Sequence, residues 1–302
     1  MNNLLRGNAL MALTAAVSWG GGDFSGGMGV KSAGGGVRAA LRVVLLSHVT
    51  SFAVLVAIAR MRGDAFPHGV LLAWGVVAGV AGGLSLTGFY IALSRGAMGV
   101  SAALSGLLAA AIPATVAMAQ DGSPGARPLV GFLVAGCAIW LIAAAPAQSP
   151  DDLQSTQGAQ RSTMILALLA GVGFGVYFVA LKMAGPAGVI WPMATARMGS
   201  LTVCSLMFLG LRMRSGDATE PHVKFGRRAA GWAMGTALLD TSGNLLFVAA
   251  TRAGRLDVAA VLASLYPAST ILLAALALGE RPTRRQALGM TTAVVAVMLI
   301  AL

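Results

Sequence analysis

The sequence AAVLASLYPASTILLAALALGERP, residues 259–282, decides the fold of this chain. Its apolar part is long enough to cross a bilayer as a helix, which takes about 20 residues. Pro267 lies inside it, and because proline removes a backbone hydrogen bond we expect the helix to bend near Ala263. A short charged turn that contains Pro282 ends the stretch.

A weaker copy of this stretch occurs about 158 residues earlier. A shift of that size sets Pro282 on Pro124, and a shift of about 155 sets Arg197 on Arg42. Repeats of this kind are the signature of one structural unit written twice.

The repeat predicts two domains of similar size. They are residues 1–146 and residues 163–302, joined by a polar linker at residues 147–162. The linker lacks apolar periodicity, so we expect it to be flexible.

The composition places the chain in a membrane. Of its 302 residues 57% are hydrophobic and only 10% are charged, which leaves too little polar surface for a soluble domain. We therefore expect an all-α polytopic membrane protein, because lipid cannot satisfy open backbone groups. The ten expected transmembrane helices cover residues 8–30, 39–59, 69–93, 97–118, 129–146, 163–183, 190–211, 229–251, 255–278 and 286–302.

Each half contains five of these spans, and five is an odd number. The second half must therefore enter the membrane from the opposite side, which gives two inverted five-helix repeats. Inverted repeats place a binding site near the midplane between the halves, and an exchange of conformation between the halves gives alternating access to it.

Four ionisable residues lie inside the expected spans, and their charges sum to zero: Asp23, Arg42, Arg197 and Asp240. An unpaired charge at mid-bilayer costs at least about 2.5–3.5 kcal/mol, so such residues pair or face a wet cavity. We expect all four to contact the substrate. Snorkelling of Arg42 to the interface and structural ion pairing are the alternatives.

The two carboxylates break the repeat, since Asp23 aligns with Phe178 and Asp240 with Gly83. This asymmetry suggests a functional difference between the halves. Either carboxylate could carry a coupling proton, if burial favours its neutral form.

A polar row recurs on the third and eighth spans. Thr87 and Tyr90 align with Asn244 and Phe247 at a shift of 157. A single intramembrane threonine usually bonds its own i−4 carbonyl, but a repeated row favours a cavity lining. Aromatic walls are expected beside it, from Trp19, Tyr90, Tyr177 and Tyr266.

The sequence lacks the motifs that nucleic-acid binding, catalysis or cofactor binding would require. The net charge of +11 is spread over loop residues that flank spans, which is typical of membrane proteins and does not indicate nucleic-acid binding. No phosphate loop, catalytic set, cofactor motif or metal-ligand spacing is present, so we expect no enzyme activity, cofactor or metal. Cys137 and Cys204 lie in apolar runs and are interpreted as small buried residues, and His48 as a packed or hydrogen-bonded core residue.

Ten spans in two halves, the Trp19-Gly20 pair, Arg42 with Arg197, and Tyr266-Pro267 followed by Gly279-Glu280-Arg281-Pro282 resemble the drug/metabolite transporter superfamily, EamA-type. The resemblance implies a ten-helix carrier of the inner (cytoplasmic) membrane, commonly an exporter of amino acids or other small metabolites, with a central cavity. The first half departs from the family at residues 121–124, where Asp-Gly-Ser-Pro replaces Gly-Glu-Arg-Pro.

The resemblance also implies that both termini are cytoplasmic. That orientation puts about seven loop lysines and arginines inside and about twelve outside, against the positive-inside tendency. We retain the orientation of the family. The expected partners are a small-molecule substrate, membrane lipid and a coupling proton.

Two other functions compete with transport. A membrane enzyme acting on lipid-linked substrates would need acidic or histidine residues clustered at one membrane face, and the acidic pair Asp151-Asp152 lies in the linker. A non-catalytic scaffold or assembly subunit would need no wet interior, so accessibility of the polar row separates it from a transporter.

Overall fold

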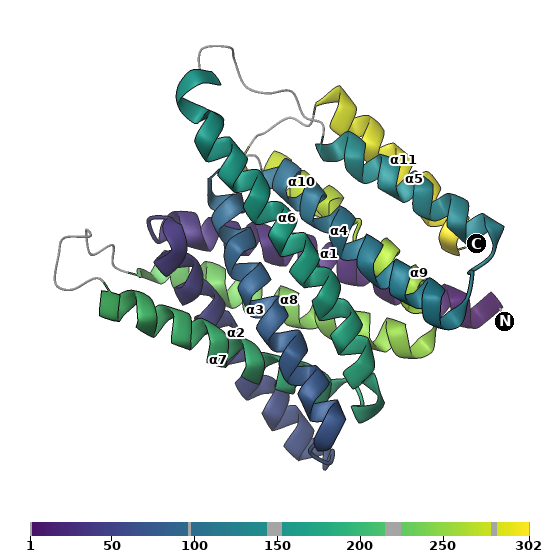
Figure 1. Cartoon of the computed structure of the whole chain (residues 1–302), viewed down its shortest axis with the longest axis horizontal. Coiled ribbons are helices and arrows are strands. Elements are labelled where there is room, and N and C mark those ends of the chain that lie inside the picture. The colour runs from purple at the N-terminus through teal and green to yellow at the C-terminus, as the bar shows by residue number, and fades with distance from the viewer. Residues whose placement is uncertain (1, 96–97, 144–152, 215–224, 279–282, 302) are drawn as a thin grey trace.

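The computed structural model describes residues 2–95, 98–143, 153–214, 225–278 and 283–301 (Figure 1). Within those ranges every regular element is a helix. The helices are α1 Asn2–Ser32, α2 Gly36–Arg62, α3 Gly69–Ser94, α4 Met98–Asp121, α5 Ala126–Ala143, α6 Leu153–Ala184, the short 3-10 helix η2 Gly185–Ala187, α7 Ile190–Arg214, α8 Arg227–Ala253, α9 Leu256–Ala263, α10 Tyr266–Leu278 and α11 Arg284–Ala301.

The described helices follow the expected spans closely. Each span coincides with one helix, except the ninth, which is divided into α9 and α10. Six stretches are long and apolar enough to cross a membrane by length and composition, on α2, α3, α4, α6, α7 and on α9 with α10. The ten-span arrangement therefore stays a prediction. The central helices α1 and α8 carry Asp23, Asp240 and Asn244, which lowers their hydropathy.

The division of the ninth span confirms the bend predicted near Ala263. Helix α9 ends at Ala263 and α10 begins at Tyr266. Pro267 has no N–H to donate to the carbonyl of Ala263, so the ladder is interrupted there. Pro113, by contrast, lies inside α4 without ending it.

The linker differs from its prediction. Helix α6 begins at Leu153, so residues 153–162 extend the helix and are not a separate flexible segment. Residues 147–152 of the linker, with Asp151-Asp152, lie outside the described residues, as does the turn at residues 279–282.

Helices from the two halves pack on one another. In Figure 1, α5 and α11 lie side by side at one edge of the molecule, and both termini lie at the same end. Helix α1 packs on α8. Their counterparts in the repeat, α6 and α3, pack on one another in the same way. Helix α2 packs on its own counterpart α7. The halves are therefore interleaved, with α1, α3, α6 and α8 at the centre.

Small residues let the central helices approach closely. A Cβ added at Gly79 of α3 would lie 1.8 Å from the carbonyl oxygen of Ala196 in α7, and one at Gly75 would lie 1.9 Å from Thr195 Oγ1. The glycines of α3 therefore form a small-residue packing seam against α7. On α1, a Cβ at Gly20 would lie 2.4 Å from Ser269 Cβ, so α10 packs directly on that glycine.

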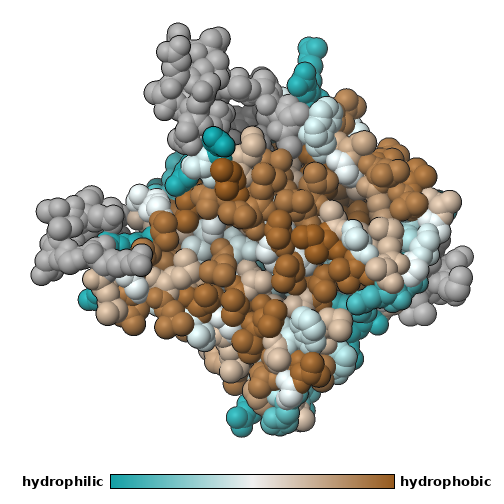
Figure 2. Space-filling model, in the orientation of Figure 1, coloured by the Kyte–Doolittle hydropathy of each residue, from teal (hydrophilic) through white to brown (hydrophobic). Residues whose placement is uncertain are grey.

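The exterior suits lipid. Figure 2 shows large apolar areas over the face in view. Large side chains project outward from several helices, for example Leu10, Leu133, Leu238 and Leu276, each more than 60% exposed. An exposed apolar surface of this extent indicates a membrane environment.

Candidate functional site

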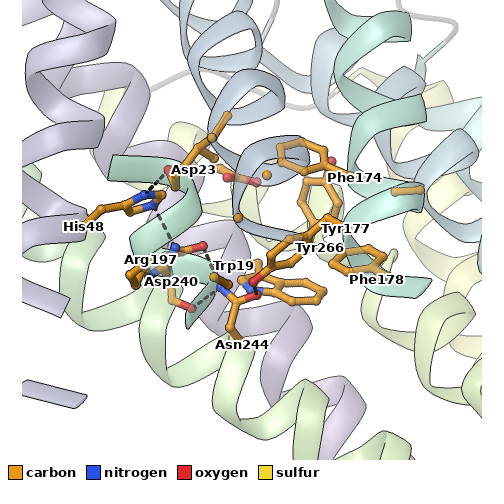
Figure 3. Close-up of a pocket in the computed structure, with 17 residues that line it drawn as sticks. Trp19, Asp23, His48, Phe174, Tyr177, Phe178, Arg197, Asp240, Asn244 and Tyr266 are labelled. Atoms are coloured by element: carbon orange, nitrogen blue, oxygen red, sulfur yellow. Dashed lines mark hydrogen bonds and ion pairs between the residues drawn. The ribbon is translucent and has the colours of Figure 1, made fainter. Parts of the chain in front are cut away.

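A cavity lies between the central helices and is lined by residues from both halves (Figure 3). Its volume is about 50 Å³. That is room for a few water molecules, each of which needs about 10–15 Å³. Figure 3 shows the polar groups Asp23, His48, Arg197 and Asp240 on one side and the rings of Phe174, Tyr177, Tyr266 and Phe178 on the other.

The ionic side is built on Arg197 of α7. Its Nη2 donates to Asp240 Oδ2 of α8 at 2.5 Å, and the Arg197 side chain is only 4% exposed. Its Nε donates to Ser51 Oγ at 3.1 Å, and its Nη1 lies 2.8 Å from His48 Nε2. The guanidinium thus contacts three partners from α2 and α8, which is the arrangement a buried arginine requires.

These contacts fix the tautomer of His48. Because arginine only donates hydrogen bonds, His48 Nε2 must accept one, and the ring proton lies on Nδ1. His48 Nδ1 then donates to Ser200 Oγ at 2.6 Å. His48 is therefore a neutral imidazole that orients Arg197, which agrees with the hydrogen-bonded role predicted for it.

A second chain of hydrogen bonds joins Asp240 to the aromatic side. Asn244 Nδ2 donates to Asp240 Oδ1 at 2.9 Å, and Asn244 Oδ1 accepts a hydrogen bond from Tyr177 Oη at 2.6 Å. The chain connects α6 of the aromatic wall to α7 and α8 of the ionic side. Both faces of the cavity are therefore positioned by one network.

The aromatic side is a packed cluster. Trp19 and Phe178 are stacked with ring centroids 5.0 Å apart, and Phe247 lies 4.7 Å from Phe178 by the same measure. Tyr177 is tilted against Phe178 at 5.5 Å. Such faces suit the apolar part of a ligand.

Asp23 differs from the other carboxylate. It lines the cavity, is 8% exposed, and has no hydrogen bond or ion pair among the described residues. Asp240 lies within electrostatic range of it. Two carboxylates therefore face one small cavity, and only one of them is paired with an arginine.

The structure brings together seven of the ten predicted site residues and places three elsewhere. Arg42 lies over the Phe208 ring at 5.8 Å. Thr87 is buried and donates to the i−4 carbonyl of Gly83, which is the alternative expected for a single threonine. Tyr90 is buried and is not among the lining residues. The predicted residues that line the cavity are Trp19, Asp23, Tyr177, Arg197, Asp240, Asn244 and Tyr266.

Ten other lining residues were not predicted from the sequence, and His48, Phe174, Phe178 and Ser200 are among them. Phe174 could have been found, because it aligns with Trp19 in the repeat, and Phe178 because it aligns with Asp23. His48 and Ser200 carry no such signal, since only the packing of α2 on α7 brings them together. Within the described residues, no three His, Cys, Asp or Glu side chains gather in a way that could hold a metal ion.

Comparisons with known proteins agree with this architecture. A crystal structure of another protein has the same fold, with a TM-score of 0.66 and 17% identity over 97% of this chain and 95% of the other. No curated protein sequence matches this chain significantly. Residues 161–302 match the EamA-like transporter family, which indicates a membrane transporter of the drug/metabolite transporter superfamily. The resemblance drawn from the sequence is thereby confirmed over residues 161–302, which match the model of the EamA-like transporter family.

Proposed function

We propose that this chain is a secondary transporter that exports small metabolites, such as amino acids, across the cytoplasmic membrane by alternating access. The observation that carries the proposal is the buried cavity between the halves, ionic on one side and aromatic on the other. Charged groups would bind the ionic ends of a metabolite and the rings its apolar part.

The packing supports inverted five-helix repeats as the mechanical basis. Helices α1 and α6 are counterparts in the repeat, and each packs on the third helix of the opposite half, α8 or α3. An exchange of conformation between the halves would open the cavity to the other side of the membrane while the central residues stay in place.

The size of the cavity supports a closed state. Ligand sites usually measure about 300–1,000 Å³, against about 50 Å³ here. A metabolite therefore requires the central helices to move apart, as they do in an alternating-access cycle.

Hydrogen bonds between loops supply a closure at the end of the molecule where both termini lie. Arg255 Nη2 donates to the carbonyl of Gly122 at 2.6 Å and to Asp257 Oδ2 at 2.8 Å. Trp191 Nε1 donates to the carbonyl of Asp64 at 2.9 Å. Under the orientation implied by the family, this closure faces the cytoplasm.

A flux assay tests the proposal. The full chain is reconstituted in liposomes, a substrate is verified with the parent protein, and Asp240→Asn and Arg197→Met are compared with it. We expect both variants to lose at least about tenfold in flux, because each leaves a buried charge without its partner. Thr202→Val is the control, since Thr202 is exposed and bonds only the carbonyl of Met198 in its own helix. Unchanged flux in both cavity variants would remove these residues from the site.

A further inference from the structure

A second pocket lies between the ends of α2, α6 and α8 and shares no lining residue with the central cavity. Its volume is about 710 Å³, within the range of about 300–1,000 Å³ that ligand sites usually have. The loop between α2 and α3 forms one wall, and the turn between α6 and α7 forms another, together with the end of α8. Both halves of the chain therefore contribute to this pocket, which the proposed function does not use.

The charged groups of the pocket leave an excess of positive charge. Its lining contains Arg62, Asp64 and Arg252. Arg62 Nε donates to Asp64 Oδ2 at 3.1 Å, so these two charges cancel. Among the described residues no carboxylate pairs with Arg252, whose Nη1 donates to the backbone carbonyl of Gly185. A guanidinium has several N–H donors, so a tie to one carbonyl leaves most of the donors of Arg252 for a ligand.

Lys182 adds to the positive charge at this end of α8. Its Nζ donates to the backbone carbonyl of Thr251, the residue before Arg252, at 2.8 Å. Lys182 and Arg252 are therefore both held by carbonyl oxygens, which orient a cation without neutralising it. The pocket is thus suited to a ligand with negative charge.

The pocket also has an apolar part, which runs along α8. Leu245 and Arg252 both line it, and two helical turns separate them, so they lie on one face of α8 about 10 Å apart along its axis. Leu71 of α3 and Ile190 of α7 are further apolar lining residues. Arg252 lies at the end of α8, whereas Leu245 lies nearer the middle of that helix. A ligand that fits has an anionic head at the helix end and an apolar body directed toward the membrane interior.

We propose that this pocket binds an anionic phospholipid, with the phosphate on Arg252 and the upper part of a chain beside Leu245. Phosphate oxygens accept paired hydrogen bonds from a guanidinium. The ends of membrane helices lie at the level of lipid head groups, and basic pockets between such helices bind anionic head groups. The excess positive charge favours phosphatidylglycerol over a zwitterionic lipid, whose ammonium group would face the same arginine.

A lipid bound here would hold the two halves together. Two residues of the pocket wall contact Trp191 of α7: its Nε1 donates to the carbonyl of Asp64 at 2.9 Å, and the ring of Phe66 lies 4.9 Å from its ring between centroids. Because the wall is complete only while these contacts hold, a ligand in the pocket stabilises them. The inference goes beyond the proposed function and does not depend on it, since lipid binding is measured without transport.

Binding of short-chain lipids to the purified full chain in detergent tests the proposal. Dioctanoyl-phosphatidylglycerol and dioctanoyl-phosphatidylcholine are titrated, and the lipid bound is measured by native mass spectrometry. The two lipids have the same chains and differ in head-group charge. Inorganic phosphate, which has no chains, is added as a competitor to distinguish a lipid site from a site for soluble anions. The melting temperature gives a second readout, because a ligand of the folded state raises it.

We expect the parent protein to bind phosphatidylglycerol more tightly than phosphatidylcholine and to melt at a higher temperature with it. Arg252→Gln should bind phosphatidylglycerol at least about tenfold more weakly, because it loses a charge-assisted contact with the phosphate. Arg228→Gln is the matched control, since it removes an exposed arginine from the opposite end of the same helix, and it should behave as the parent. Leu245→Trp fills the apolar part without a change of charge and should also weaken binding of the lipid.

Unchanged binding of phosphatidylglycerol in Arg252→Gln, or equal binding of the two lipids by the parent, would overturn the proposal. Displacement of the lipid by inorganic phosphate at equal concentration would also overturn it, since the pocket would then bind soluble anions. If Arg252→Gln does not fold, Leu245→Trp decides, and unchanged lipid affinity in that variant contradicts the site. The proposed function fails separately: protein that binds phosphatidylglycerol as expected but carries no substrate leaves the lipid site standing and shows transport to be wrong.

Discussion

Tyr177 Oη donates a hydrogen bond to Asn244 Oδ1 across 2.6 Å, and this bond joins the aromatic side of the cavity to its ionic side. Asn244 in turn holds Asp240, the partner of Arg197. The position of the ion pair between Arg197 and Asp240 therefore depends on Tyr177, which belongs to the aromatic side of the cavity.

Tyr177→Phe should weaken substrate binding without removing the aromatic wall. The change leaves Asn244 Oδ1 without its donor, and an unpaired buried acceptor costs about 1–3 kcal/mol. We expect the KM for a verified substrate to rise by roughly five- to a hundredfold. Flux measured against substrate concentration checks this. Thr115→Val is the control, because Thr115 is exposed and bonds only the carbonyl of its own helix at Ala111. An unchanged KM in Tyr177→Phe would show that this hydrogen bond does not position the site.

The ion pair should behave as a coupled unit in stability. Arg197→Met or Asp240→Asn alone should lower the free energy of unfolding by about 3–5 kcal/mol, since each leaves a buried charge or its hydrogen-bond partners unpaired. The double variant should be less destabilised than the sum of the two single variants. A double-mutant cycle on the melting of the purified protein measures the coupling. Additive effects would contradict a direct interaction between the two side chains.

Two glycines provide a matched test of helix packing. Gly79→Ala places a Cβ where the carbonyl oxygen of Ala196 stands, so α3 must move away from α7. Gly210→Ala places it in open space on α7 and should stabilise by up to about 1 kcal/mol, because alanine is the better helix former. We therefore expect Gly79→Ala to lower the melting temperature by several degrees and Gly210→Ala to leave it equal or higher. Equal effects would show that the two helices do not touch at Gly79.

Accessibility separates a transporter from a scaffold. In a background with Cys137→Ala and Cys204→Ala, Asn244→Cys should react with a small water-soluble thiol reagent, because Asn244 lines the cavity. Thr87→Cys should be protected, since Thr87 lies outside the cavity lining and bonds the carbonyl of Gly83 in its own helix. The labelling rates are compared by mass spectrometry. Protection of both positions would favour the scaffold, and rapid labelling of Thr87→Cys would contradict the packing of α3 on α7.

The sequence by itself determined the helical class, the helix order and the break before Pro267. These depend on local chemistry: apolar runs of bilayer length and a residue that cannot donate a backbone hydrogen bond. It also indicated seven residues of the cavity, because a buried charge or a repeated polar row has few roles in a membrane.

Only the tertiary structure decided which polar residues meet. Thr87 and Asn244 are equivalent in the repeat, yet Asn244 lines the cavity and Thr87 bonds its own helix. His48 and Ser200 are 152 residues apart and join Arg197 through the packing of α2 on α7. Asp23 and Asp240 look alike in the sequence, and packing leaves one without a partner while it pairs the other. The physical reason is that a hydrogen bond or ion pair depends on distances of about 3 Å between helices, which helical periodicity within one helix does not fix.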